Sequence, residues 1–145
     1  MLHNDINSKG NLQWFYFSVN VEYPMELRFN IINLLKYDSL FNYGMQICVF
    51  SEKRHRKTGE GWIRAGKKIV YERSDLLVEN QSKRSYYSLS FTYDFKSEDR
   101  VYFAHSFPYT YSRLNDMLLG IISNPIKAKT CRREIIGTTL MNLNV

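Results

Sequence analysis

The stretch YYSLSFTYDF, residues 86–95, decides the fold class of this chain. Every second residue in it is large and apolar, which gives one face with five side chains: Tyr87, Leu89, Phe91, Tyr93 and Phe95. The residues between them are mostly small or polar. A hydrophobic period of two is typical of a β-strand that buries one face and leaves the other near solvent. The stretch therefore predicts a strand that covers one side of a core.

Strand patterns recur on both sides of this stretch. Alternating, β-branched or aromatic residues predict further strands, at residues 12–19, 26–34, 45–50, 61–64, 67–72 and 100–105. Turn residues stand between many of them, and Ser82–Ser85 is predicted to be an exposed loop. Strands at this spacing, with no helices alternating between them, favour an antiparallel β-sandwich over a parallel α/β fold. We expect a mainly β chain.

The pattern changes near the C-terminal end, where apolar residues recur at helical spacing. This predicts one short helix that is capped by Ser112 and ends before Pro125. Further on, residues 134–141, EIIGTTLM, predict a strand whose partners lie outside the chain. A strand without partners indicates the start of another domain. We therefore expect a β-sandwich domain over residues 1–111 and a junction over residues 112–145.

The net charge of +6 is unevenly distributed along the chain. Residues 53–68 contain seven basic side chains and one acidic side chain, Glu60. The net charge of this segment is therefore +6, the same as that of the whole chain. The seven are Lys53, Arg54, Arg56, Lys57, Arg64, Lys67 and Lys68. Charge of one sign raises the local potential and can steer an acidic partner to the surface. The other interpretation is a solvated hairpin loop whose Lys and Arg keep a sheet edge from pairing.

Two aromatic groups also allow two interpretations. Residues 14–17, WFYF, form either a stacking surface for a sugar or a single-stranded nucleic acid, or sandwich core with one ring at the rim. Tyr109 and Tyr111 flank Thr110 just before the predicted helix. They either line a cleft or pack at a domain seam. The residues themselves leave both questions open.

The residues alone predict no catalytic or metal site. The three histidines are scattered, and Cys48 and Cys131 share no C-x-x-C motif, so we expect reduced thiols, one of them in the core. No G-x-S-x-G motif and no phosphate-binding loop is present. The N-terminal residues are polar, and no apolar run approaches the ~20 residues of a membrane span. We expect a soluble cytoplasmic protein that does not bind membranes.

A resemblance to a known family adds to this picture. Residues 13–17, QWFYF, are similar to the opening motif of the N-terminal domain of the cytosolic carboxypeptidases, which are zinc peptidases that remove glutamates from proteins, tubulin in particular. Further motifs match in the same order: FNIINL at 29–34, NYGM at 42–45, GW at 61–62, YYSLSF at 86–91, VYFA at 101–104 and FPYTYS at 107–112. Asp5 and Asn7 fit a short lead-in. The resemblance covers residues 5 to about 122.

The resemblance implies a fold and a separate role for each of two domains. In this family an antiparallel β-sandwich precedes an α/β carboxypeptidase domain, and residues 130–145 would begin that domain. The domain seam is then formed by Tyr109, Thr110, Tyr111 and Ser112. The resemblance also implies a strand before the lead-in, which we expect this chain to lack. The zinc ligands, an H-x-x-E pair and a later His, and the catalytic Glu match no position here. The resemblance therefore implies no catalytic or metal residue in this chain, and zinc only in the parent enzyme.

The implied function is that of an accessory N-terminal domain. The parent would be a zinc metallocarboxypeptidase that removes C-terminal or side-chain glutamates from proteins such as tubulin, whereas this chain alone would not be an enzyme. Its expected partners are the catalytic domain in cis and glutamate-rich tails, with residues 53–68 as the acidic-substrate patch; nucleic acid is not expected. An association with the cytoskeleton is left open. The alternative is a non-catalytic β-sandwich module that binds an acidic protein tail, nucleic acid or carbohydrate.

Overall fold

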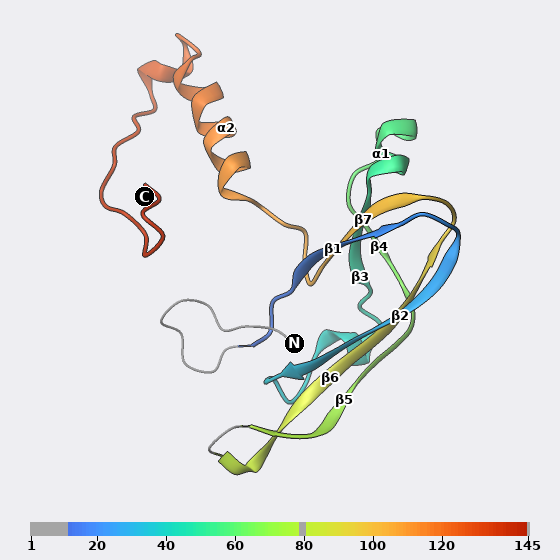
Figure 1. Cartoon of the computed structure of the whole chain (residues 1–145). Coiled ribbons are helices and arrows are strands. Elements are labelled where there is room, and N and C mark those ends of the chain that lie inside the picture. Colours follow the sequence, from blue (N-terminus) through green and yellow to red (C-terminus); the bar gives the residue numbers. More distant parts are fainter. Residues whose placement is uncertain (1–11, 79–80, 145) are drawn as a thin grey trace. The chain divides into compact units, whose positions relative to one another are not determined.

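The computed structural model describes residues 12–78 and 81–144 of the chain (Figure 1). The expected lead-in residues Asp5 and Asn7 lie outside the described residues. The chain forms two compact units, of which the first ends at Phe107 and the second begins at Pro108. None of the described helices has the length and apolar character that a membrane crossing needs.

The first unit is built from two antiparallel sheets, which confirms the mainly β fold class. One sheet has the strand order β1-β7-β3-β4, with bounds Tyr16–Val21, Asp99–Ala104, Ile47–Ser51 and Ile63–Ala65. The other has the order β2-β6-β5, with bounds Met25–Leu34, Gln81–Phe95 and Lys67–Val78. A short 3-10 helix, η1, spans Leu40–Tyr43, and the helix α1 spans Glu52–Thr58.

The alternating stretch 86–95 lies in β6, the central strand of the three-stranded sheet. Its register with β2 places Phe91 opposite Phe29 and Leu89 opposite Ile31. Leu89 and Phe91 are fully buried, so the predicted inward face is confirmed. Ser90 and Thr92 of the other face are also buried, and the Arg28 guanidinium donates to the Ser90 hydroxyl at 3.3 Å.

Aromatic rings join the two sheets. Phe17 and Phe103 come from the four-stranded sheet, and Phe29 and Phe91 come from the three-stranded one. Phe103 lies 5.4 Å from Phe17 and 4.9 Å from Phe29 between ring centroids, and Phe29 lies 5.1 Å from Phe91. Such pairs contribute about 0.5–1.5 kcal/mol each beyond the burial of their area. The core therefore lies between the sheets and is largely aromatic.

The structure corrects two predictions about the first unit. Ser82–Ser85 is not an exposed loop but part of β6, because the long strand β5 pairs with it as far as Val78 opposite Gln81. A pairing partner outweighs local polarity in a strand. The segment that follows β3 forms α1, so the hairpin-loop interpretation of the basic segment is wrong for residues 52–58. That helix has no apolar periodicity and is built from Lys, Arg and Glu, which are good helix formers.

The second unit contains α2, Tyr111–Ile122, and a 3-10 turn, η2, at Lys127–Lys129. The predicted helix is present, but the predicted cap was wrong: the Thr110 hydroxyl, not Ser112, accepts from the Arg113 N–H at 3.2 Å. The strand expected at residues 134–141 is also absent from the described part of the chain. Only an isolated bridge joins Thr138 and Asn144 there, since no neighbouring strand offers hydrogen bonds.

Candidate functional site

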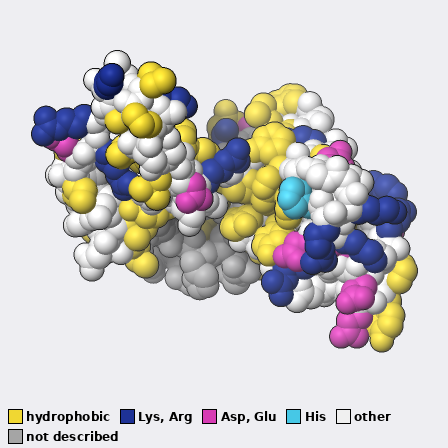
Figure 2. Space-filling model, turned by 90° about the horizontal axis from the view of Figure 1, so that it is seen from above, with side chains coloured by type: hydrophobic (Ala, Val, Ile, Leu, Met, Phe, Trp, Pro, Cys, Tyr) yellow, Lys and Arg dark blue, Asp and Glu magenta, His cyan; other side chains and the backbone are white. Residues whose placement is uncertain are grey.

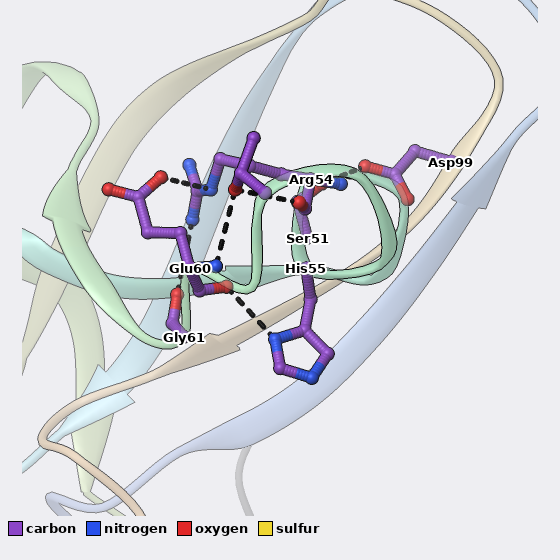
Figure 3. A network of polar contacts seen from close by, with 7 residues as sticks. Ser51, Arg54, His55, Glu60, Gly61 and Asp99 are labelled. Atoms are coloured by element: carbon purple, nitrogen blue, oxygen red, sulfur yellow. Dashed lines mark hydrogen bonds and ion pairs between the residues drawn. The ribbon is translucent and has the colours of Figure 1, made fainter.

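The helix α1 is the centre of the basic segment, and its first turn is held by the opposite strand. Antiparallel register pairs Ser51 with Val101, so Asp99 lies beside the helix start. One Asp99 carboxylate oxygen accepts from the Lys53 N–H at 2.9 Å. The other accepts from the Ser51 hydroxyl (Figure 3). The Ser51 oxygen in turn accepts from the Arg54 N–H at 3.0 Å. A carboxylate here also interacts favourably with the helix dipole.

The other end of α1 is held by the loop that follows. Gly59 adopts a left-handed conformation with φ 74°, and its N–H donates to the His55 carbonyl at 2.8 Å. The Arg54 guanidinium forms an ion pair with Glu60 at 3.0 Å, and the His55 ring lies 3.1 Å from the Glu60 carbonyl (Figure 3). A helix of seven residues is marginal in isolation. These contacts at both ends are what keep its basic side chains in place.

One face of α1 borders a cleft of about 290 Å³. The helix supplies Lys53, Arg54 and Lys57 to its lining, and the end of β6 and the turn after it supply residues 93–97. Phe95 and Val101 form an apolar floor and are themselves almost fully buried. Figure 2 shows Lys and Arg side chains gathered over this part of the molecule, with fewer acidic ones between them.

The charges that line the cleft are only partly compensated. Asp94 forms ion pairs with Lys96, to which it is also hydrogen-bonded, and with Lys67 at 3.8 Å. The hydrogen bond from Lys96 lowers the pKa of Asp94 below its ordinary value. Lys53 and Lys57, in contrast, form no ion pair within residues 12–78 and 81–144. Positive charge is therefore available at the mouth of the cleft.

The opposite face of α1 meets an aromatic cluster on the outer surface of the four-stranded sheet. The cluster consists of Tyr16, Phe50, Trp62 and Tyr102, with neighbouring ring centroids 5.6–6.1 Å apart. The Tyr102 hydroxyl donates to the Glu52 carboxylate at 2.9 Å, and the His55 ring lies 5.1 Å from that of Phe50. The helix thus separates a basic cleft from an aromatic surface.

The structure places the seven predicted basic residues in different surroundings. Lys53, Arg54 and Lys57 line the cleft, whereas Arg56 lies outside its lining and forms an ion pair with Glu52 at 3.7 Å. The Arg64 guanidinium donates to the carbonyls of Gln46 at 2.6 Å and His105 at 3.3 Å and lies over the Phe107 ring. Lys67 pairs with Asp94, and Lys68 pairs with Glu26 at 3.5 Å. Arg64 is therefore tied to the backbone, whereas Lys53, Arg56 and Lys57 of α1 are exposed.

The aromatic run at residues 14–17 is divided between the inside and the outside. Phe15 is 2% exposed and Phe17 packs against the core, whereas Trp14 and Tyr16 are 52% and 49% exposed. Of the expected seam residues, Thr110 caps α2, the Tyr109 hydroxyl lies 3.4 Å from the Met117 sulfur, and the Tyr111 hydroxyl donates to the Asn144 carbonyl at 3.2 Å. Ser112 lies exposed in the first turn of α2.

Sequence reasoning missed two contributors to this site, Lys96 and Asp99. Both lie outside the basic segment: Asp99 reaches α1 because β7 pairs with β3, and Lys96 lines the cleft from the turn after β6. A charged turn between two predicted strands, Lys96–Asp99, is the signal that could have indicated them. Within the part of the chain that the structure describes, no group of three or more His, Cys, Asp or Glu is placed to hold a metal ion. The two cysteines are free, with Cys48 buried and Cys131 exposed, as expected.

Comparison with known proteins finds no family model that matches this chain. Individual proteins do match. Cytosolic carboxypeptidase 1 of Homo sapiens is 44% identical over 97% of this chain, and cytosolic carboxypeptidase 3 of Mus musculus is 39% identical over 94% of it. Cytosolic carboxypeptidase 2 of Danio rerio is 39% identical over 96%. The chain spans only 12–19% of the length of these relatives.

Proposed function

This chain belongs to the cytosolic carboxypeptidase family and spans 12–19% of the length of its relatives. We therefore propose that it is the accessory N-terminal domain of a zinc metallocarboxypeptidase. The observation that carries this proposal is the similarity itself, which runs through nearly the whole chain. In this proposal the β-sandwich domain covers residues 1–111, and residues 112–145 lead into the catalytic domain. The division into two units near Phe107 supports that arrangement.

The reaction belongs to the catalytic domain in cis. The relatives extend far beyond the matched segment, which leaves room for a catalytic domain there. The described residues of this chain do not fit a zinc site, because they bring no group of three or more His, Cys, Asp or Glu together in a way that could hold a metal ion. We therefore assign zinc, the hydrolysis of the peptide bond and the release of glutamate to the parent enzyme. The names of the relatives support a cytoplasmic location.

The contribution of this chain would be to bring in the substrate. Glutamate-rich tails, such as those of tubulin, carry dense negative charge, and α1 presents an accessible basic surface. A concentrated field of opposite sign increases the rate of encounter, and does so most at low ionic strength. Association with the cytoskeleton would follow from the same contact. The basic surface would thus act on association rather than on the chemical step.

The test reverses charge on α1 in the full-length parent. Lys53→Glu, Arg56→Glu and Lys57→Glu together leave Arg54 and its contacts with the following loop intact. We expect the association rate constant for a glutamate-rich peptide to fall roughly tenfold at low salt and to approach the wild-type value at about 0.15 M. The matched control reverses Lys127, Lys129 and Arg132, which changes the net charge equally. Equal slowing by both variants would contradict a role of α1.

One observation favours a second function, that of a free-standing binding module. Aromatic rings beside basic side chains are typical of surfaces that stack bases or sugar rings, and the cluster around Trp62 and Tyr102 has this character. In that case an oligonucleotide or an oligosaccharide at micromolar concentration should quench Trp62 fluorescence, measured in a Trp14→Phe background so that Trp62 is the single tryptophan. A parent enzyme that releases glutamate, together with unchanged Trp62 fluorescence, would rule this function out.

A further inference from the structure

The cleft beside α1 has the chemical composition of a binding site for a negatively charged side chain. Its floor is apolar, with Phe95 and Val101 below and the half-buried Tyr93 ring at the side. Its rim is basic, with Lys53 and Lys57 on the helix and Lys96 across from them. Its volume of about 290 Å³ lies at the small end of ligand sites, so it suits one side chain or two rather than a folded partner.

The two carboxylates of the cleft do not stand in the way of an anion. Both oxygens of Asp99 already accept hydrogen bonds, from the Ser51 hydroxyl and the Lys53 N–H. Asp94 is paired with both Lys96 and Lys67. The charge of Asp94 is compensated by its two lysines, and the oxygens of Asp99 are occupied by hydrogen-bond donors. Lys53 and Lys57 on the helix together outweigh the single negative charge of Asp99.

The two lysines of α1 are arranged so that both can contact one ligand. Lys53 and Lys57 are four residues apart on α1, and residues at this spacing lie on the same face of a helix. Both line the cleft, and neither forms an ion pair with any described residue. The capping contacts of Asp99 and Gly59 fix the helix that carries them. A carboxylate between the two ammonium groups would gain two ion pairs without displacing an existing one.

We propose that this cleft binds a glutamate side chain of an acidic peptide, with Lys53 and Lys57 on the carboxylate and the aliphatic stem against Tyr93 and Phe95. The proposal rests on the proposed function, since it names the place at which the acidic tail is held. It differs from general attraction to α1, because Arg56 does not line this cleft and is paired with Glu52. Lys96 closes the far rim and keeps Asp94 neutralised.

The experiment measures binding of a short fluorescein-labelled polyglutamate peptide to the 145-residue chain by anisotropy at low salt. Lys53→Gln with Lys57→Gln is expected to raise Kd about five- to thirtyfold, the equivalent of two partly exposed ion pairs. The matched control, Arg56→Gln with Lys68→Gln, removes the same charge outside the cleft and is expected to raise Kd less than about threefold. Amide spectra of both variants check that α1 remains folded.

Three outcomes would overturn the proposal. Equal weakening by the two double variants would mean that the peptide responds to overall charge. That result would leave the proposed function intact but would refute the cleft as the binding site. Tighter binding of oligothymidylate than of polyglutamate, with the same dependence on Lys53 and Lys57, would assign the cleft to nucleic acid. No measurable binding of polyglutamate would refute the cleft and the docking role together. Conversely, if the cleft binds the peptide but charge reversal on α1 leaves association with the parent unchanged, the proposed function fails and the site remains.

Discussion

The substitution Asp99→Asn tests how α1 is held in place. An asparagine keeps one oxygen for the Lys53 N–H but presents an amide group to the Ser51 hydroxyl and carries no charge. Loss of a cap costs about 0.5–2 kcal/mol, and loss of a carboxylate at a helix N-terminus costs about 0.3–1 kcal/mol. Because the capping contact lies at the surface, we expect a total of about 1–2 kcal/mol. No residue of α1 is buried, so this loss should open the helix and not the core.

Native-state hydrogen exchange followed by NMR separates the two effects. A loss of about 1–2 kcal/mol corresponds to exchange that is roughly five to thirty times faster at the α1 amides. Amides of β6 such as Leu89 and Phe91 should exchange as in the wild type, since they open with the whole sandwich. Asp75→Asn, an exposed position on β5, gives the same change of charge as a control. Equal acceleration in α1 and β6, or none in α1, would refute the reasoning.

Further predictions concern the core, the pH dependence and the metal. Phe103→Ala removes a ring that contacts Phe17 and Phe29, and urea unfolding should show a loss of about 3–5 kcal/mol, with a smaller loss for Phe103→Leu; a loss below about 1 kcal/mol would contradict an aromatic core. Burial lowers the pKa of His105, with Arg64 adding to the effect, so the unfolded chain takes up this proton at a higher pH than the folded one. The stability that this group contributes is present above its ordinary pKa of about 6.5 and is lost as the pH falls below that value. The drop in thermal midpoint from pH 7 to pH 5 should therefore be smaller in His105→Gln than in the wild type. An equal drop in both proteins would show that His105 does not contribute. EDTA should stop glutamate release by the parent but leave the thermal midpoint of the 145-residue chain unchanged, and a fall of several degrees would indicate a metal site in this chain.

The sequence predicts the sheets well because their signal is local. The alternation through Leu89 and Phe91 needs no knowledge of a partner strand, since a period of two already separates the two faces. The helix α1 gives no such signal. Its seven residues are all polar or charged, and the contacts that stabilise it come from Asp99 in another strand. A pattern along the chain cannot include a partner that only strand pairing supplies.

The basic site was predictable in its charge and not in its arrangement. Counting Lys and Arg identifies the segment, but it treats Arg64 and Lys57 alike. In the structure Arg64 donates to two backbone carbonyls, whereas Lys57 lines the cleft without a partner among the described residues. That difference depends on the register of β3 with β4 and β7, which places the Gln46 and His105 carbonyls within reach of Arg64. Register is a tertiary property, and composition does not contain it.

The two cysteines differ in exposure, and this difference allows one of them to be labelled selectively. Burial raises the pKa of the Cys48 thiol, so at neutral pH it is protonated and shielded from reagents. Cys131 lies exposed in the second unit. A maleimide dye should therefore attach to Cys131 alone in the native chain and reach Cys48 only after unfolding. Once Trp14→Phe leaves Trp62 as the single donor in the first unit, energy transfer to that single dye reports the distance between the two units.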